Sequence, residues 1–242
     1  MSKAPVAQAR TPLPEAAPSS AADVAAFVQA ARTAAPPRGE GRGRLAFALD
    51  ATASRQPTWA LACDIQADML AVAAAHGGLK MQIVYYRGHD ECRASPFMDE
   101  AAALRRLMGK ISCEGGLTQI GRVLEHLSRE AERSGLRAAV FVGDALEEPP
   151  EALHAAAGQL ALRGVRLFMF QEGHDPRVEK VFRAIAAVTG GAFCRFDAHA
   201  GAELRALLSA VAAYAAGGPA ALAARRDAGT QKLIAAMGGQ AR

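Results

Sequence analysis

Five short apolar runs, spaced along most of the chain, constrain its fold more than any other feature. The first, Leu45 to Leu49 (LAFAL), is too short and too apolar for anything but a buried strand. The other runs have a similar character and lie at 80–86, 138–142, 166–170 and 192–196. Near-continuous apolar strands are typical of a parallel sheet that helices cover on both faces.

Helical patterns separate these runs. Apolar residues recur at helical spacing after Pro57, from Ile120 to Ala131, from Val178 to Ile185 and from Leu204 to Ala215. The last pattern ends at the breaker sequence Gly217-Gly218-Pro219. One link differs, because the segment from Tyr86 to Cys92 has room for a tight turn and a short returning strand near 91–95.

These patterns predict a doubly wound α/β domain at 44–216. Its sheet is expected to be mostly parallel and six-stranded, with one antiparallel edge strand and helices on both faces, the Rossmann-like arrangement. Residues 1–19 have no periodicity and are expected to be disordered. A short helix and a Gly/Arg linker are expected at 20–43, and a C-terminal tail with helical patterns at 217–242. The helix and the tail could pack on the domain or bind a partner.

Charge and composition exclude several classes of protein. The net charge of +4 is mild and the arginines are spread along the chain, so nucleic acid is not expected as a partner. No apolar run approaches the roughly 20 residues of a membrane span, and no signal-peptide pattern opens the chain. No CxxC pair occurs among Cys63, Cys92, Cys113 and Cys194. Reduced thiols are therefore expected, and a cytoplasmic location.

Oxygen-bearing side chains stand at two predicted strand ends and one helix start. Asp50, Thr52 and Ser54 occupy alternate residues directly after the first strand. Thr118 lies in a glycine-rich loop before the helix at Ile120, and Asp144 follows the strand at 138–142. Ligands of open α/β sheets bind at the carboxyl ends of the strands. Two carboxylates and three hydroxyls at that edge suit Mg²⁺ or Mn²⁺, which prefer oxygen ligands.

This ordered set resembles the metal-ion-dependent adhesion site of the von Willebrand factor A (VWA) domain. The resemblance covers roughly 44–216 and includes the D-x-T-x-S motif, the threonine of the Gly-Gly loop, the Gly-Asp pair and the antiparallel edge strand. It implies that the metal is held by Asp50, Thr52, Ser54, Thr118 and Asp144. The hydroxyls would bind the metal directly, while one or both aspartates could act through water. Thr52 stands where serine is common in the family, and both supply one hydroxyl.

The resemblance implies a binding module rather than an enzyme. Because the directly coordinating hydroxyls carry no full charge, the metal would stay electrophilic and accept an Asp or Glu carboxylate from a protein partner. The relatives implied are bacterial intracellular single-domain proteins, for which the partner is not specified.

Other interpretations of these residues stay open. A polar turn with Ser54 as a helix N-cap would explain the first motif. Thr118 could cap the following helix, or an anion could bind there, although no P-loop lysine follows. Glu147 and Glu148 are expected to face solvent. The segment His89–Cys92 is expected to turn a hairpin rather than to bind zinc.

A metal-dependent phosphohydrolase of haloacid dehalogenase type is the alternative function. That chemistry needs a nucleophilic aspartate after the first strand and a second acid two residues later. Asp50 fits the first requirement, but position 52 is a threonine. A dinucleotide-binding fold is a weaker alternative, because no G-x-G-x-x-G follows the strand at 45–49.

Overall fold

The computed structural model describes residues 43–59, 68–69, 71–73, 78–196 and 201–238. All of them belong to the unit formed by Pro36–Arg242. The predicted disordered tail at 1–19 lies outside the described residues, as does all but Gly43 of the predicted helix and linker at 20–43. Residues 60–67 of the helix predicted after Pro57 also lie outside them.

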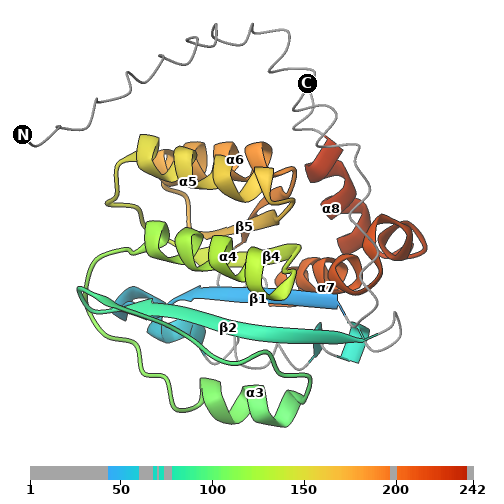
Figure 1. Cartoon of the computed structure of the whole chain (residues 1–242), viewed down its shortest axis with the longest axis horizontal. Coiled ribbons are helices and arrows are strands. Elements are labelled where there is room, and N and C mark those ends of the chain that lie inside the picture. The colour runs from blue at the N-terminus through green and yellow to red at the C-terminus, as the bar shows by residue number, and fades with distance from the viewer. Residues whose placement is uncertain (1–42, 60–67, 70, 74–77, 197–200, 239–242) are drawn as a thin grey trace, which may run out of the picture. The chain divides into compact units, whose positions relative to one another are not determined.

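Six strands form one mixed sheet within the described residues, in the order β3-β2-β1-β4-β5-β6 (Figure 1). Their bounds are β1 Gly43–Asp50, β2 Leu79–Arg87, β3 Glu91–Ala94, β4 Ala138–Gly143, β5 Arg166–Glu172 and β6 Ala192–Phe196. All neighbouring pairs are parallel except β2 with β3, which is antiparallel. The predicted mostly parallel sheet with an antiparallel edge strand is therefore confirmed.

The strand order reverses at β1. Leu49 of β1 pairs with Tyr85 of β2 on one side and with Val142 of β4 on the other. The chain leaves β1 to form β2 and β3, and then returns to the opposite side of β1 as β4. The carboxyl ends of β1 and β4 therefore form the topological switch point, where open α/β sheets bind their ligands.

The β2–β3 hairpin turns at Gly88, whose φ of +59° lies in the left-handed region that favours glycine. Arg87 pairs with Glu91 across this turn, and its Nε lies 3.0 Å from Glu91 Oε2. Arg93 contacts the same carboxylate at 2.8 Å. The segment His89–Cys92 thus turns a hairpin, as predicted, and the Glu91 carboxylate is engaged by two arginines.

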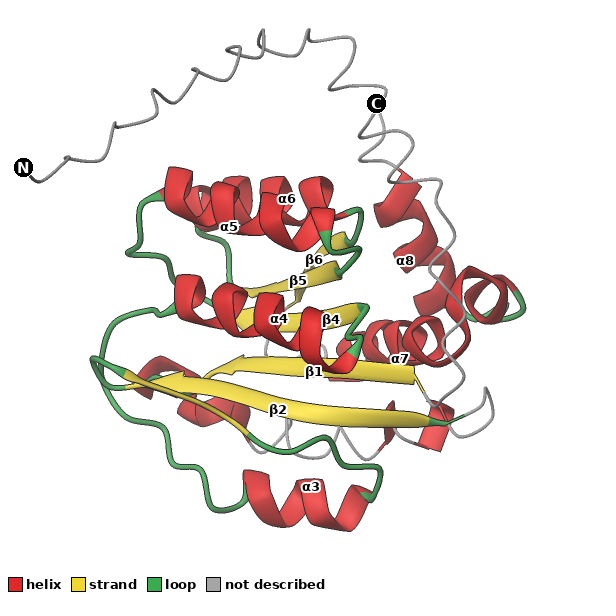
Figure 2. Cartoon of the chain, in the orientation of Figure 1, coloured by secondary structure: helices red, strands yellow, loops and turns green. Residues whose placement is uncertain are grey.

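Helices cover both faces of the sheet (Figures 1 and 2). One face is covered by α4 Ile120–Ser134, α5 Pro150–Leu162 and α6 Pro176–Thr189. The opposite face is covered by α3 Ala101–Met108, α7 Gly201–Ala223 and α8 Ala228–Gly238. The periodic patterns predicted α4, α6 and α7. They missed α3, which buries only Leu104 and Met108, and α5, whose many alanines leave no distinct apolar stripe.

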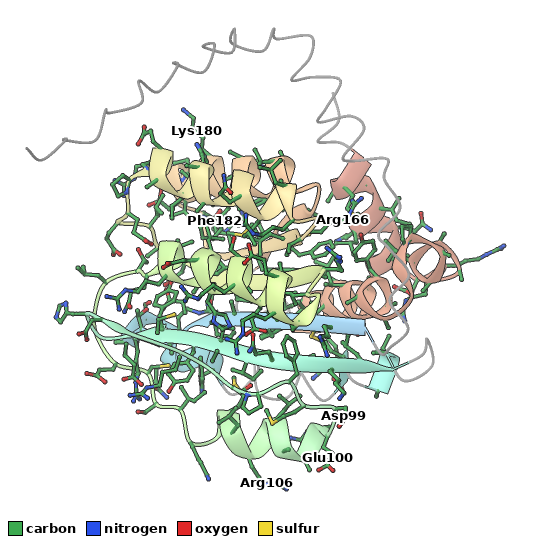
Figure 3. The ribbon with its side chains drawn as sticks, viewed as in Figure 1. Asp99, Glu100, Arg106, Arg166, Lys180 and Phe182 are labelled. Carbon is green, nitrogen blue, oxygen red and sulfur yellow. The ribbon has the colours of Figure 1, made fainter. Side chains whose placement is uncertain are left out.

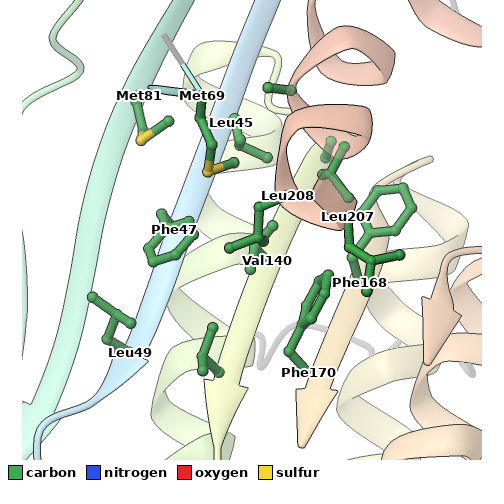
Figure 4. Close-up of a cluster of buried hydrophobic side chains, with 14 of the residues drawn as sticks. Leu45, Phe47, Leu49, Met69, Met81, Val140, Phe168, Phe170, Leu207 and Leu208 are labelled. Atoms are coloured by element: carbon green, nitrogen blue, oxygen red, sulfur yellow. The ribbon is translucent and has the colours of Figure 1, made fainter. Parts of the chain in front are cut away.

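Alternate residues of the central strands point to opposite faces, which gives the sheet two hydrophobic cores. Leu45, Phe47 and Leu49 of β1 lie in the core that contains Leu207 and Leu208 of α7 (Figure 4). All five side chains are at most 2% exposed. The burial of β1 on both faces explains why its sequence is a continuous apolar run.

The second core lies under α4, α5 and α6. Phe182 of α6 is fully buried there and meets the ring of Phe141 edge-on at 5.5 Å. Lys180 of the same helix is exposed, as are Asp99, Glu100 and Arg106 at α3 (Figure 3). Helix α6 therefore presents an apolar side to the sheet and a charged side to solvent.

Helix α7 is the one described helix that is long and apolar enough, by length and composition alone, to cross a membrane. Half of its apolar window, Leu204–Ala223, is buried inside the fold. Its backbone leaves helical geometry at Gly218, beside Pro219, where the sequence predicted a stop. Helical structure resumes after this kink, and Leu222 and Leu233 of the following segments are buried in the same core as β1.

Candidate metal centre

Asp50 ends β1 with a fully buried side chain. Its Oδ1 accepts a hydrogen bond from the Thr52 backbone N–H at 2.7 Å, and its Oδ2 accepts one from the Tyr86 hydroxyl at 2.9 Å. Burial raises the pKa of Asp50, hydrogen bonds from Thr52 and Tyr86 oppose this rise, and the charge of Asp144 adds to it. The carboxylate is thus held in one orientation. Its burial and the charge of Asp144 disfavour its ionised form, and a nearby cation would stabilise that form.

Thr52 and Ser54 place two hydroxyl oxygens 3.1 Å apart. The Thr52 side chain is buried and Ser54 is exposed, so the pair extends from the core to the surface. The 3₁₀ helix η1, Ala53–Thr58, begins before Ser54. Ser54 is therefore not a helix N-cap, and the alternative that explained the motif by capping is wrong for this residue.

The glycine-rich loop is tied to both neighbouring strand ends. The Glu114 backbone N–H donates to the Ala51 carbonyl at 3.0 Å, and the Leu117 N–H donates to the Gly88 carbonyl at 3.1 Å. Gly116 lies directly on that turn, because a Cβ at this position would be 1.9 Å from Gly88 O. A side chain cannot fit there, which explains the glycine in the sequence.

Thr118 is fixed by a reciprocal pair of hydrogen bonds with Glu147. The Thr118 N–H donates to Glu147 Oε2 at 2.7 Å, and the Glu147 N–H donates to Thr118 Oγ1 at 3.1 Å. The residue that immediately precedes α4 is Gln119, so Thr118 is not its N-cap. One lone pair of the Thr118 hydroxyl accepts this bond and a second is left for another ligand.

Glu148 supplies the cap that α4 needs. Its carboxylate accepts hydrogen bonds from the N–H groups of Ile120 at 2.5 Å and Gly121 at 2.8 Å. Burial raises the pKa of Glu148, and these bonds oppose the rise. Glu147 is exposed, as predicted, whereas Glu148 is half-buried. The sequence did not predict that both carboxylates accept hydrogen bonds at the start of α4.

Asp144 follows Gly143 at the end of β4. A Cβ on Gly143 would lie 3.7 Å from the Cβ of Asp50, so the ends of β1 and β4 meet at this point. Asp144 Oδ1 is buried and has no hydrogen-bond partner among the described residues. Leaving a buried polar atom unpaired costs about 1–3 kcal/mol, and more for a charged one. Such an oxygen fits a position next to a cation.

The residues at this edge fit a hard divalent cation. Magnesium typically takes one or two carboxylates and completes its shell with other oxygens and water. Across the part of the chain that the structure describes, no three His, Cys, Asp or Glu side chains gather as a metal-binding group. The predicted set contains only two carboxylates, Asp50 and Asp144, and its other members are hydroxyls.

Three segments far apart in the sequence therefore interlock at the switch point. The first motif contacts the glycine-rich loop through Ala51 and Glu114, and the loop contacts the β4 end through Thr118 and Glu147. The sequence did not predict that Tyr86, Glu147 and Glu148 support the candidate site. It also did not predict that Arg55, next to Ser54, is buried. Each of these residues acts through a contact with a residue distant in sequence, which no local pattern predicts.

The sheet order, the antiparallel edge strand and the helices on both faces give this chain the fold of a VWA domain. Solved structures similar to it are VWA domains from several kinds of organism. A von Willebrand factor type A protein from Catenulispora acidiphila superposes with a TM-score of 0.57 at 19% identity, over 72% of this chain and 43% of that one. No protein-family model and no curated protein matches the chain.

Two further structures show how widely this fold is shared. The VWA domain of SpRpn10 has a TM-score of 0.53 at 9% identity, over 65% of this chain and 89% of that chain. Proximal thread matrix protein 1 from the mussel byssus, with zinc in its MIDAS motif, has a TM-score of 0.55 at 16% identity. The match covers 70% of this chain and 45% of the mussel protein, so this chain spans less than half of that relative.

Proposed function

We propose that this chain is a divalent-metal-dependent protein-interaction module rather than an enzyme. Asp50, Thr52, Ser54, Thr118 and Asp144 would hold Mg²⁺ or Mn²⁺ at the switch point. The bound ion would offer a coordination position to an Asp or Glu carboxylate of a protein partner. The observation that carries the proposal is the buried, unpartnered Oδ1 of Asp144 at the same edge as the other predicted ligands.

The chain's own residues support such a site by holding the ligands in place. Tyr86 orients Asp50, and Glu147 orients Thr118. Groups of this kind raise metal affinity because they remove rotamer freedom from the ligands before binding. The metal-occupied MIDAS motif of a structural neighbour adds support for a divalent ion in this fold.

Metal binding is tested by calorimetric titration of MgCl₂ and MnCl₂ into the full chain. Asp144→Ala is expected to lower the affinity by at least about tenfold, because it removes one of two carboxylates. Asp90→Ala is the matched control, since Asp90 is an exposed carboxylate in the nearby β2–β3 turn. Circular dichroism checks that both variants fold. Equal affinity in Asp144→Ala and wild type would overturn the proposed site.

Partner binding is tested by affinity capture in Mg²⁺ or in EDTA. A partner that binds through the site is lost in EDTA and is not captured by Asp50→Ala. A partner set that is the same in both buffers contradicts a metal-dependent interaction. Hydrolysis of a phosphate ester by wild type but not by Asp50→Ala would instead support the phosphohydrolase alternative.

A further inference from the structure

Arg55 is a buried cation beside the proposed metal site. It follows Ser54 in η1, and its side chain is only 3% exposed. Its Nη1 forms an ion pair with Oε2 of Glu172, at the carboxyl end of β5. A buried guanidinium destabilises a fold unless carboxylates compensate its charge. The position of Arg55 therefore depends on the acidic groups around it.

Two of these acidic groups are predicted metal ligands. Burial lowers the pKa of Arg55, and the charges of Asp144 and then Asp50 act in the opposite direction. The strand register brings these carboxylates to one edge, because Leu49 of β1 pairs with Val142 of β4 and Gly143 of β4 pairs with Gln171 of β5. Asp50 ends β1, Asp144 directly follows β4 and Glu172 ends β5, and β4 lies between the other two strands in the sheet. Arg55 thus shares one electrostatic environment with carboxylates from three strand ends.

We propose that Arg55 is a built-in counter-charge that sets the metal affinity of this site. The proposal rests on the function proposed above. Without metal, the guanidinium compensates Asp50 and Asp144, which would otherwise repel each other in a buried place. With a divalent ion bound, Arg55 repels that ion, and Glu172 offsets the repulsion.

The formal charges agree with this role. Three carboxylates and one guanidinium give −3 + 1 = −2, and one divalent cation brings the group to neutrality. Without Arg55 the group would carry −3. The site would then attract a divalent ion more strongly, but the metal-free protein would be less stable. Arg55 thus lowers the metal affinity of the site and raises the stability of the metal-free fold.

The test compares Arg55→Met, Arg55→Lys and Glu172→Gln with wild type. Mg²⁺ and Mn²⁺ affinities are measured by calorimetry, and metal-free thermal unfolding is measured in EDTA. Arg55→Met is expected to bind the ion about tenfold more tightly and to unfold at a lower temperature in EDTA. Arg55→Lys keeps the charge and is expected to stay within about threefold of wild type. Glu172→Gln is expected to weaken binding by about tenfold, because it leaves the charge of Arg55 unopposed.

The opposite directions separate an electrostatic role from a structural one. If Arg55 only packs the η1 segment, Arg55→Met displaces Ser54 and weakens metal binding, which overturns the proposal. Equal affinities in Glu172→Gln and wild type also overturn it, and this variant decides the question if Arg55→Met does not fold. Wild-type protein that binds neither ion refutes the proposed function itself, a result distinct from either of these.

Discussion

Replacement of Gly116 by alanine is the sharpest test of how the glycine-rich loop is positioned. A Cβ at Gly116 would lie 1.9 Å from the Gly88 carbonyl oxygen and 2.2 Å from its carbon. Ordinary contact begins near 3.4 Å, so the two backbones must separate by about 3.4 − 1.9 = 1.5 Å. Neither partner is the end of a flexible side chain, and rotamer changes cannot relieve this overlap.

The expected cost follows from two effects. Overpacking of this kind typically costs about 1–3 kcal/mol. The same shift lengthens the hydrogen bond from the Leu117 N–H to Gly88 O, now 3.1 Å, and weakens it. Because Thr118 follows two residues later, its hydroxyl moves with the loop. Gly116→Ala is therefore expected to lower the free energy of unfolding by about 1–3 kcal/mol and the metal affinity by at least about tenfold.

Gly115→Ala is a matched control from the neighbouring position. A Cβ at Gly115 meets no atom within 4 Å, and its φ is not positive. Its free energy of unfolding is expected to stay within about 0.5 kcal/mol of wild type. Urea titration followed by circular dichroism measures both variants, and calorimetry measures Mg²⁺ binding. Equal stability of the two variants would refute the reasoning, because of these two glycines Gly116 lies against the Gly88 turn and Gly115 does not.

Three further changes test other parts of the fold. Tyr86→Phe removes the hydroxyl that donates to Asp50 and is expected to cost about 1–3 kcal/mol in urea titration at neutral pH; wild-type stability would show that this bond is dispensable. Asp175→Ala removes the N-cap acceptor of the Arg177 N–H in α6, 2.8 Å away, and is expected to lower stability by about 1 kcal/mol. Burial lowers the pKa of His126 in the folded protein. Below the ordinary histidine pKa, the unfolded chain therefore binds a proton at His126 more readily than the folded protein does. The free energy of unfolding falls as the pH is lowered through this range. His126→Gln should therefore lose less thermal stability than wild type between about pH 7 and about pH 5, and parallel profiles would contradict this.

The strands were predictable because burial on both faces of the sheet requires apolar residues at consecutive positions. β1 is buried on both faces from Leu45 to Asp50, so nearly every residue in it is apolar. The order of strands and helices then gives a doubly wound sheet. The short helix α3 was missed although Ala101, Leu104, Leu107 and Met108 recur at helical spacing, because eight residues give only two turns of the pattern. Helix α5 was missed for a different reason, since alanine packs against the sheet yet is common on exposed surfaces as well.

The first motif of the candidate site could be picked out for a local reason. Asp50, Thr52 and Ser54 lie within five residues, and the turn after a buried strand brings them to one edge. The supporting groups act over long sequence distances. Tyr86 is 36 residues from Asp50, and Glu148 is 28 residues from Ile120. No periodicity or spacing predicts such contacts, because they form only when the folded sheet brings these distant segments together.

If the chain binds a divalent ion as proposed, the contacts at this edge would make the affinity a property of several segments and not of the five proposed ligands alone. Ala51 bonds to Glu114, and Thr118 bonds to Glu147, so a shift in one segment displaces the next. The Tyr86 hydroxyl of β2 donates a hydrogen bond to Asp50, and the charge of Asp50 opposes the lowering of the Arg55 pKa by burial. Asp50 and Asp144 carry like charges at this edge, and the bonds between the segments hold them in place against their mutual repulsion. The fold therefore holds oxygen-bearing side chains rigidly where the strand order reverses, which is the arrangement that the proposed divalent site would require.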